Sequence, residues 1–510
     1  KINKMSKKIL KFDEISYFLK KFRGRKKLVL CHGVFDLLHI GHIKHFEDAK
    51  KQGDILIVSI TPDKYVNKGP NKPYFNEKLR LDAIAALKCV DYVILNKSST
   101  SVEIIKKVKP NIYCKGKDYK NKKDDLTGNI QKEINAVKAN KGKIYFTHNI
   151  TFSSSSIINS VFNIYSKSQR SHINKIKNKF TFKDILKYLE SFKKIKVLVI
   201  GETIIDNYNF CEAIGKAGKE STLVFRNLSS ESYVGGAAAI ARHLSSFCKK
   251  ITLLTLIGNK KKDKNFIRKR LPKNITLETI GNTKLKTIKK TRFVENSNNH
   301  KIFGLDEMSD SPLGKSDENN FKRKLKKHLK YFDLVIVTDY GHGFISKSTA
   351  NFICKNSKFL SVCTQINASN SSYHTIENYK NLENLIFNER ELRHELRDRS
   401  SSIEKLMNIL TKKNKIKNLI ITQGSDGSKL YSHSTNKFFS SPAYAIEVKD
   451  KVGAGDAMLS IISLCLKSKM DKNLSLFISS ICAAQNVSNF GNKIPIKKME
   501  ILKSIENILK

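Results

Sequence analysis

The stretch CHGVFDLLHIGHIKH, Cys31–His45, decides the fold of the first part of the chain. It continues the apolar run KKLVL and predicts a strand that ends in a glycine turn, with a helix beginning near His42. In a parallel sheet such a loop lies at the carboxyl edge, where α/β folds bind ligands. His39 and His42, with Gly41 between them, can both donate hydrogen bonds to one phosphate there. The alternative is a pair of ordinary surface histidines.

Strands and helices alternate on the C-terminal side of this stretch. The apolar runs DILIVSITPD, VDYVIL and NIYCKG predict strands, and NEKLRLDAIAALK and SVEIIKKVKP predict the helices between them. This alternation is typical of a parallel sheet with helices on both faces. We expect a first domain over residues 1–160 and a linker over 161–193, where Lys, Ser and Asn are frequent and apolar periodicity is weak until FKDILKYLESF, which predicts a helix.

A second α/β domain is predicted over residues 194–510, beginning with the strand IKVLVIGETIID. Near its end, EVKDKVGAGDAML places Gly453, Ala454 and Gly455 directly ahead of a helical pattern. Amides of such small residues can form an anion hole at a helix N-terminus. Asp456 follows in the first turn, where a carboxylate can take the proton of an alcohol that attacks a γ-phosphate. A simple helix cap is the alternative interpretation of this loop.

The formal net charge of +49 suggests nucleic acid as a partner. However, the lysines are spread along the whole chain, which indicates a composition bias, and we expect anionic small molecules and no nucleic acid. The nine cysteines occur singly, so we expect reduced thiols and a cytoplasmic protein. No apolar run approaches the roughly 18 residues of a membrane span, and the start KINKMSKK lacks the apolar core of a signal peptide, with Met5 as a candidate first residue.

The segment GVFDLLHIGH resembles the His-x-Gly-His motif of the nucleotidyltransferase superfamily. YCKGKDY is similar to a segment of its ADP-heptose synthase branch, and TFSSSSIIN to its late Ser/Thr-rich motif. The resemblance implies a Rossmann-like domain that uses ATP or CTP, in which His39 and His42 stabilise the transferring phosphoryl group. The further nucleotide-binding residues that it implies are Gly33, Phe35, Gly41, Lys44, Arg80, Lys115, Ser155 and Ser156.

The second domain resembles the ribokinase-like (PfkB) sugar kinases through DKVGAGD, GGAAAIARHL, GETIIDNY, NERE and ITQGSDGSKLY, in the family's order. The resemblance implies an α/β sandwich that uses Mg²⁺ and ATP, with Asp456 as the catalytic base. The anion hole and ATP site would comprise Gly453, Ala454, Gly455, Asn388, Glu391, Thr422, Gly424 and Gly427. The sugar would be held by Asp206, Gly235 and Gly236. We expect no direct protein ligand for the metal, with Glu391 as a contact through water.

Three positions depart from the kinase pattern. Ala239 stands where the family usually has Asn, Gln365 or a neighbour replaces an Asp after a strand, and Lys451 replaces the usual Thr. One interpretation is a bifunctional enzyme that phosphorylates a sugar phosphate and then makes a nucleotide-activated sugar, similar to the fused heptose enzymes but with the domains in reversed order. The other is a nucleotidyltransferase with a degenerate, ligand-binding kinase-like domain. In either case we expect a homodimer.

Overall fold

The structure is a computed structural model that describes residues 8–66, 73–117, 129–147, 165–280, 285–309, 311–371, 374–445 and 447–509. The chain divides into two compact units. The first comprises Lys1–Ser166 with Leu502–Lys510, and the second comprises Lys167–Ile501. Each unit has its own sheet.

Six parallel strands form the sheet of the first unit, in the order β1-β4-β3-β2-β5-β6. The strands are β1 (Ile9–Leu10), β2 (Leu28–Gly33), β3 (Ile55–Ile60), β4 (Tyr92–Leu95), β5 (Ile112–Gly116) and β6 (Lys143–Thr147). From β2 the chain adds β3 and β4 on one side, and it later adds β5 and β6 on the other. The switch between β2 and β5 leaves a crevice at their carboxyl ends, the usual ligand site of such sheets.

Both faces of this sheet are covered, as the alternating pattern predicts. Along β2, Val29 and Cys31 belong to one core with Phe46, whereas Leu28 and Leu30 belong to another with Ile105. The helices are α2 (Ile15–Phe18), α3 (Ile40–Lys50), α4 (Glu77–Ala85), α5 (Val102–Val108) and α6 (Asn129–Ala139), with 3₁₀ turns η1 (Leu19–Phe22) and η2 (Asp63–Tyr65). The first core includes side chains of α3 and α4, and the second includes those of α2, α5 and α6. The Rossmann-like prediction is confirmed.

The second unit is built on a larger sheet in the order β10-β9-β7-β13-β14-β15-β16-β17-β18. The strands from β10 to β16 are parallel, and β17 and β18 add an antiparallel edge. Their bounds are β7 (Lys196–Lys216), β9 (Lys250–Leu256), β10 (Ile275–Ile280), β13 (Leu334–Asp339), β14 (Leu360–Thr364), β15 (Leu382–Asn388), β16 (Ile416–Thr422), β17 (Ser428–Ser432) and β18 (Lys437–Ser441). Branched apolar residues dominate the central strands, as expected for strands buried on both faces.

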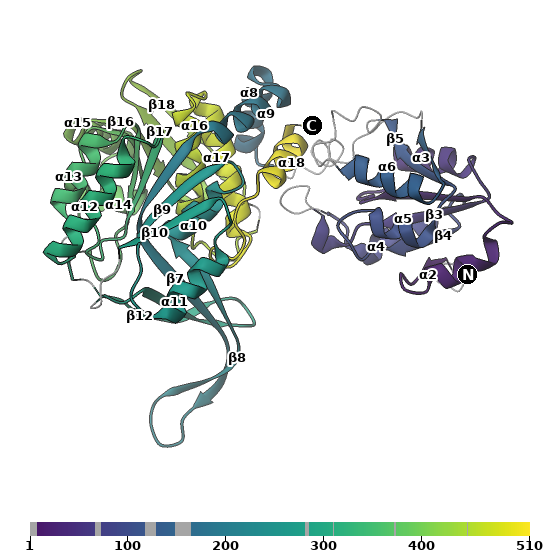
Figure 1. Cartoon of the computed structure of the whole chain (residues 1–510), viewed down its shortest axis with the longest axis horizontal. Coiled ribbons are helices and arrows are strands. Elements are labelled where there is room, and N and C mark those ends of the chain that lie inside the picture. Colours follow the sequence, from purple (N-terminus) through teal and green to yellow (C-terminus); the bar gives the residue numbers. More distant parts are fainter. Residues whose placement is uncertain are drawn as a thin grey trace. The chain divides into compact units, whose positions relative to one another are not determined.

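Helices cover both faces of this sheet and make the expected α/β sandwich (Figure 1). One layer is α12 (Lys315–Leu329), α13 (Lys347–Asn356), α14 (Glu389–Leu396) and α15 (Ile403–Asn414), which share one large core with the sheet. The other layer includes α10 (Ala237–Leu244), α16 (Ala454–Lys467) and α17 (Lys472–Val487). The remaining elements are α11 (Lys261–Arg270), α18 (Lys498–Leu509), η5 (Phe192–Lys194), η6 (Ile376–Asn378) and η7 (Gly424–Asp426). Helix α16 is almost entirely buried beyond its first turn, so its N-terminus is held firmly at the sheet.

Strand β7 continues past the main sheet into a second one. From Thr203 onward it pairs antiparallel with β8 (Leu223–Gly236) and parallel with β11 (Ile288–Glu295), which pairs in turn with β12 (Lys301–Glu307). The ends of β7 and β8 project from the unit as a two-stranded arm (Figure 1). The arm exposes the apolar side chains of Ile214, Leu223, Val224 and Leu228.

Part of the predicted linker is helical. Residues 167–191 form α8 (Lys167–Lys179) and the predicted helix α9 (Phe182–Ser191), both in the second unit. Helix α8 buries Ile173, Ile176 and His172, whose Nδ1 lies 2.8 Å from the Tyr444 hydroxyl. The abundance of Lys, Ser and Asn concealed this helix, because three inward-facing side chains are enough to anchor it.

Candidate active sites

The two histidines of the first unit lie together where β2 gives way to α3. His39 is the N-cap of α3, and its Nδ1 accepts a hydrogen bond from the Gly41 amide at 3.0 Å. Since Nδ1 accepts, the neutral ring carries its proton on Nε2. The His39 and His42 rings are stacked with their centroids 3.9 Å apart. The helix N-terminus and two imidazoles therefore meet at one point, an arrangement suited to an anion.

The loop before the histidines has a strained backbone. Phe35 and Leu37 have positive φ values of 49° and 47°, which non-glycine residues rarely adopt. The Phe35 ring packs edge-on against His42, with centroids 5.5 Å apart. A Cβ at Gly33 would lie 2.9 Å from the tip of that ring, so Gly33 makes room for Phe35. Gly33 and Phe35 thus position His42 in this structure.

Lys115, at the end of β5, lies on the other side of the switch point from β2. Its ammonium is 3.0 Å from the carboxylate of Glu133 on α6, and both side chains are buried. Burial, and secondarily the Lys115 charge, lowers the pKa of His45 to about 4 and that of His32 to about 3. These two histidines are therefore neutral at physiological pH. Sequence reasoning identified Lys115 but missed its partner Glu133.

The structure gives Arg80 a role besides the predicted one. Its buried guanidinium donates to the carbonyls of Val34, Thr61 and Phe75 and to Asp63, at 2.5–3.0 Å. Four of its five N–H groups are therefore used in holding the loop after β2 to the loop after β3. That Arg80 neutralises triphosphate charge stays a prediction, and the structure adds a loop-holding role that the sequence did not indicate.

Of the other predicted residues of the first site, Lys44 is described by the structure and two serines are not. Lys44 lies on the exposed face of α3, where it forms an ion pair with Glu47 at 2.8 Å. Ser155 and Ser156 lie outside the described residues. Asp36, which sequence reasoning did not select, is buried and accepts hydrogen bonds from the Tyr74 and Phe75 amides. Asp36 therefore joins the loop after β2 to the segment that precedes α4.

In the second unit, the predicted base lies at the N-terminus of α16. Gly453 is the N-cap with φ +87°, and Ala454 and Gly455 begin the helix, so the three form the expected turn at the helix N-terminus. A Cβ at Gly453 would overlap the side chain of Asn492. Burial raises the pKa of Asp456 to about 7, although hydrogen bonds from Tyr340 and Asn492 oppose the rise. A carboxylate with such a pKa is suited to accept a proton near neutral pH.

The predicted sugar-binding residues lie together on β7 and β8. Gly235 faces Asp206 so closely that a Cβ there would overlap the carboxylate, and Gly236 has φ +60° with no room for a side chain. Arg292 of β11 donates to Asp206 at 2.6 Å, and both side chains are largely buried. Sequence reasoning missed Arg292, since a single Arg in a strand has no motif to mark it.

Asn388 and Glu391 form a reciprocal capping box at the start of α14. The Glu391 carboxylate accepts from the amides of Asn388 and Ile366, and burial raises its pKa to about 7. Both of its oxygens are engaged by the backbone, so Glu391 does not fit a direct Mg²⁺ ligand. Among the described residues, no group of three or more His, Cys, Asp or Glu side chains is arranged to hold a metal ion.

The nucleotide turn between β16 and β17 contains the three predicted residues. Thr422 ends β16 and donates weakly to the Phe387 carbonyl at 3.4 Å. Gly424 and Gly427 both have positive φ, at 61° and 94°. A Cβ at Gly427 would overlap the Ser441 carbonyl of β18, whereas one at Gly424 would meet nothing within 4 Å. Only Gly427 is therefore required by packing.

The departures from the kinase pattern occupy contrasting environments. Ala239 is buried inside α10, and Gln365 is exposed at the end of β14. Asp450, at the start of the DKVGAGD motif, is buried and accepts hydrogen bonds from Lys301, Tyr208 and the Gly491 amide. Burial would raise the pKa of Asp450, but these donors outweigh it and hold the pKa below its usual value. Asp450 thus fixes the loop that leads into the anion hole.

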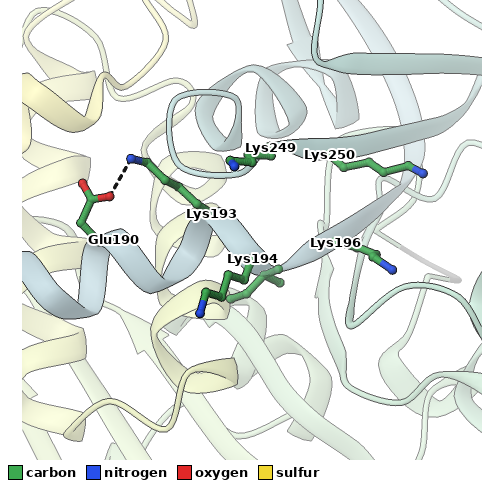
Figure 2. A pocket seen from close by; sticks show the side chains of 7 residues that line it. Glu190, Lys193, Lys194, Lys196, Lys249 and Lys250 are labelled. Atoms are coloured by element: carbon green, nitrogen blue, oxygen red, sulfur yellow. Dashed lines mark ion pairs between the residues drawn. The ribbon is translucent and has the colours of Figure 1, made fainter.

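A cavity of about 500 Å³ in the second unit lies away from this site. Figure 2 shows its lining at the start of β7 and β9, where Glu190 lies at one side and forms an ion pair with Lys193 at 2.6 Å. The other charged residues of the lining are Lys194, Lys196, Lys249 and Lys250. Asp456 contacts Tyr340, which follows the carboxyl end of β13. Since β7, β9 and β13 are parallel, the cavity is at the opposite edge of the sheet from the predicted base.

The comparison with known families agrees with this geometry. Residues 194–499, more than half of the chain, match the model of the pfkB family carbohydrate kinases. The chain belongs to the pfkB family. Its pfkB unit resembles phosphofructokinase-2 from Escherichia coli in complex with potassium, with a TM-score of 0.51 and 13% sequence identity, covering 62% of this chain and 99% of that one. At that identity the likeness shows the fold alone.

The N-terminal part matches a different family. Residues 30–160 match the cytidylyltransferase-like model. The Bifunctional protein HldE of Aliarcobacter butzleri is 39% identical over 136 residues, which cover 26% of this chain and 28% of that protein. The Bifunctional protein HldE of Helicobacter pylori is 35% identical over 158 residues, covering 29% and 34%. The matched stretch lies in the N-terminal region of this chain. It spans about a third or less of the length of these relatives.

The pfkB chain therefore combines a kinase-type unit with a cytidylyltransferase-like unit, both from families of transferases. No helix of the described part is long and apolar enough to cross a bilayer. All nine cysteines are free thiols.

Proposed function

We propose that the chain is a bifunctional enzyme that makes a nucleotide-activated sugar. In the predicted second domain, residues 194–510, a sugar phosphate receives a phosphoryl group from ATP on its anomeric hydroxyl. In the predicted first domain, residues 1–160, the resulting sugar 1-phosphate attacks the α-phosphorus of a nucleoside triphosphate and pyrophosphate leaves. The observation that carries this proposal is Asp456, a carboxylate with a pKa of about 7 at a glycine-lined helix N-terminus. Residues 161–193 connect the two domains in this proposal.

The kinase step follows from the chemistry of that loop. The sugar oxygen forms a bond to the γ-phosphorus, its proton passes to the Asp456 carboxylate, and the bond to ADP breaks. The amides of Gly453, Ala454 and Gly455 and the dipole of α16 stabilise the charge on the transferring group. Mg²⁺ enters with ATP, held by phosphates and water, which agrees with the backbone engagement of Glu391.

The transferase step uses the histidine loop. The His39 and His42 rings each donate an N–H that stabilises charge on the α-phosphate as the sugar phosphate attacks and pyrophosphate departs. The N-terminus of α3, with Gly41 in its first turn, adds its partial positive charge. Lys115 is the predicted cation across the switch point, and nucleotide binding there competes with Glu133 for it.

A phosphorylated sugar is the acceptor best supported by the surroundings of Asp206. Arg292 places a permanent cation next to this carboxylate, within the predicted sugar site. Guanidinium groups bind phosphate well because they offer paired donors. Among phosphorylated sugars, the resemblance of the motifs to those of the fused heptose enzymes favours heptose 7-phosphate as substrate and an ADP-heptose as product; CTP is the alternative nucleotide.

A second candidate function remains open because of Ala239 and Gln365. In this alternative the chain is a nucleotidyltransferase for a sugar or polyol phosphate, and its kinase-like unit only binds ligand. The intact turn at Gly453 and the raised pKa of Asp456 favour the bifunctional enzyme. Either function gives small-molecule partners without nucleic acid or membrane, in the cytoplasm. The exposed apolar side chains of the β7–β8 arm support a homodimer.

The test separates the two reactions. Purified protein is incubated with heptose, hexose and polyol phosphates and with ATP or CTP, while ADP and pyrophosphate are measured separately. The bifunctional proposal predicts ADP formation that Asp456→Asn abolishes, with at least about a 10³-fold loss. ADP formation that is unchanged in this variant would contradict the kinase assignment. Pyrophosphate release that survives His39→Ala and His42→Ala would contradict the transferase assignment.

A further inference from the structure

We infer that Tyr340 and the His243–Asn492 pair are positioning residues that hold the two carboxylate oxygens of Asp456. Tyr340 donates to Oδ1 at 2.9 Å, and the Asn492 amide faces Oδ2 at 3.5 Å. Neither residue belongs to the motifs that led to Asp456. The inference rests on the proposed kinase function, because it concerns how the base of that reaction is oriented and kept ionised.

The backbone around Tyr340 is fixed at several points. Its amide donates to the buried carboxylate of Glu202 at 3.2 Å. Its carbonyl accepts from the side-chain amides of Asn367 and Asn370, at 2.9 and 2.8 Å. The Tyr340 ring is itself buried. With backbone and ring held in this way, the phenol is kept within hydrogen-bonding distance of Asp456 Oδ1.

A chain of hydrogen bonds through His243 and Asn492 begins at a backbone amide and ends at Asp456. The Ile496 amide donates to His243 Nδ1 at 3.1 Å, so the His243 proton must be on Nε2. That Nε2–H then donates to Asn492 Oδ1 at 3.1 Å. With its oxygen so engaged, Asn492 presents its NH₂ group to Asp456. Burial lowers the pKa of His243 to about 4, and the ring therefore stays neutral in this role.

The glycine of the anion hole belongs to the same arrangement. A side chain at Gly453 would overlap the Asn492 amide oxygen, so the small residue that opens the hole also admits the amide. Arg242, next to His243 on α10, donates to the Asn492 carbonyl at 2.9 Å and fixes that backbone. Asn492 therefore contacts both Gly453 of the predicted anion hole and the Asp456 carboxylate.

The chemical consequence concerns the proton that leaves the sugar hydroxyl. As the sugar oxygen bonds to the γ-phosphorus and the bond to ADP breaks, the proton goes to an Asp456 oxygen, which must be unprotonated and correctly aimed. Burial and the charge of Asp206 on β7 favour the protonated form, whereas Tyr340 and Asn492 favour the carboxylate. Cys363 on β14 is influenced by the Asp456 charge, and its thiol stays protonated because burial, then nearby carboxylates, raise its pKa. The two donors thus keep the base usable near neutral pH.

The test compares two buried tyrosines that each donate to one carboxylate. Tyr340→Phe removes the donor to Asp456, whereas Tyr379→Phe removes a donor to Asp339 at 2.7 Å and serves as the matched control. The pKa of Asp456 is measured by ¹³C NMR of aspartate labelled at the carboxyl carbon, with Asp456→Asn assigning the resonance. We expect a midpoint near pH 7 in the unmodified protein, a midpoint about one pH unit higher in Tyr340→Phe, and no change in Tyr379→Phe.

Turnover gives the second readout. The acidic limb of kcat/KM for ADP formation should move upward by the same amount in Tyr340→Phe, and Asn492→Leu should move it in the same direction by less, because its contact is longer. An Asp456 midpoint that is the same in Tyr340→Phe and the unmodified protein would overturn the inference, even if the kinase is active. Absence of ADP formation in the unmodified protein would instead overturn the proposed kinase function, and the NMR titration would still decide the role of Tyr340.

Discussion

The histidine loop of the first unit and the Gly453–Asp456 loop of the second differ in how their charged side chains are paired. Both place a group at a helix N-terminus on the carboxyl side of a parallel sheet. In the first unit the nearby cations are already paired, Lys115 with Glu133 and Arg80 with Asp63. In the second unit the key carboxylate is held by neutral donors and its pKa is raised. The cations of the first site are thus neutralised by carboxylates of the same unit, whereas the carboxylate of the second site has a pKa near neutral pH.

We propose that this contrast separates residues that take part in the reactions from residues that hold a loop in place. In the first site, the His39 and His42 rings stack on each other, whereas Lys115 and Arg80 form ion pairs with Glu133 and Asp63. In the second, the Asp456 carboxylate accepts hydrogen bonds from Tyr340 and Asn492, and we propose that it acts as the base. A cation seen in a sequence beside a phosphate-binding motif is therefore weak evidence for phosphate binding, because the fold itself uses such charges.

The largest effect expected from breaking the first site is on pyrophosphate release. His42→Ala should lower kcat for that reaction by about 10²–10³-fold, since it removes one donor from the developing charge. ADP formation by the second unit should be unchanged, because the sites lie in separate units. Parallel assays of the two products on one preparation check this. A similar loss of both activities would mean that the variant acts on folding and not on the transferred group.

The next largest effect should distinguish Arg80 from Lys44. Arg80→Ala removes a buried guanidinium from four hydrogen-bond acceptors and should lower the free energy of unfolding of the first unit by about 2–3 kcal/mol. Lys44→Ala removes an exposed ion pair and should change it by less than about 1 kcal/mol. Urea denaturation of both variants measures the difference. Equal stability of the two would leave Arg80 with only the predicted role in phosphate binding.

A smaller effect should sharpen the sugar site of the second unit. Arg292→Leu should raise KM for a phosphorylated sugar by about tenfold, the loss of one charge-assisted contact. For the same sugar without its distal phosphate, KM should change much less, because Arg292 then has only Asp206 as partner. Initial rates of ADP formation with the two sugars make the comparison. An equal rise for both would assign Arg292 to holding Asp206 rather than to substrate phosphate.

Motifs and apolar periodicity predicted both parallel sheets, the histidine loop and the turn before α16. The strands β8, β11 and β12 were not predicted, because they form a partly exposed sheet whose side chains are mostly polar. Helix α8 was missed for the same reason. The sequence could not predict the roles of Arg80, Arg292 and Tyr340, since each depends on a partner elsewhere in the sequence. The separation is 17 residues from Arg80 to Asp63 and 116 residues from Tyr340 to Asp456.

The central claim is that two separate sites on one chain act in sequence, and a complementation assay tests it most directly. Heptose 7-phosphate and ATP are supplied to Asp456→Asn, to the double variant His39→Ala/His42→Ala, and to a mixture of both, and pyrophosphate release is followed. The account predicts almost no release from either variant alone and restored release from the mixture, because sugar 1-phosphate made by one protein is consumed by the other. Release by Asp456→Asn alone at the unmodified rate would contradict the account.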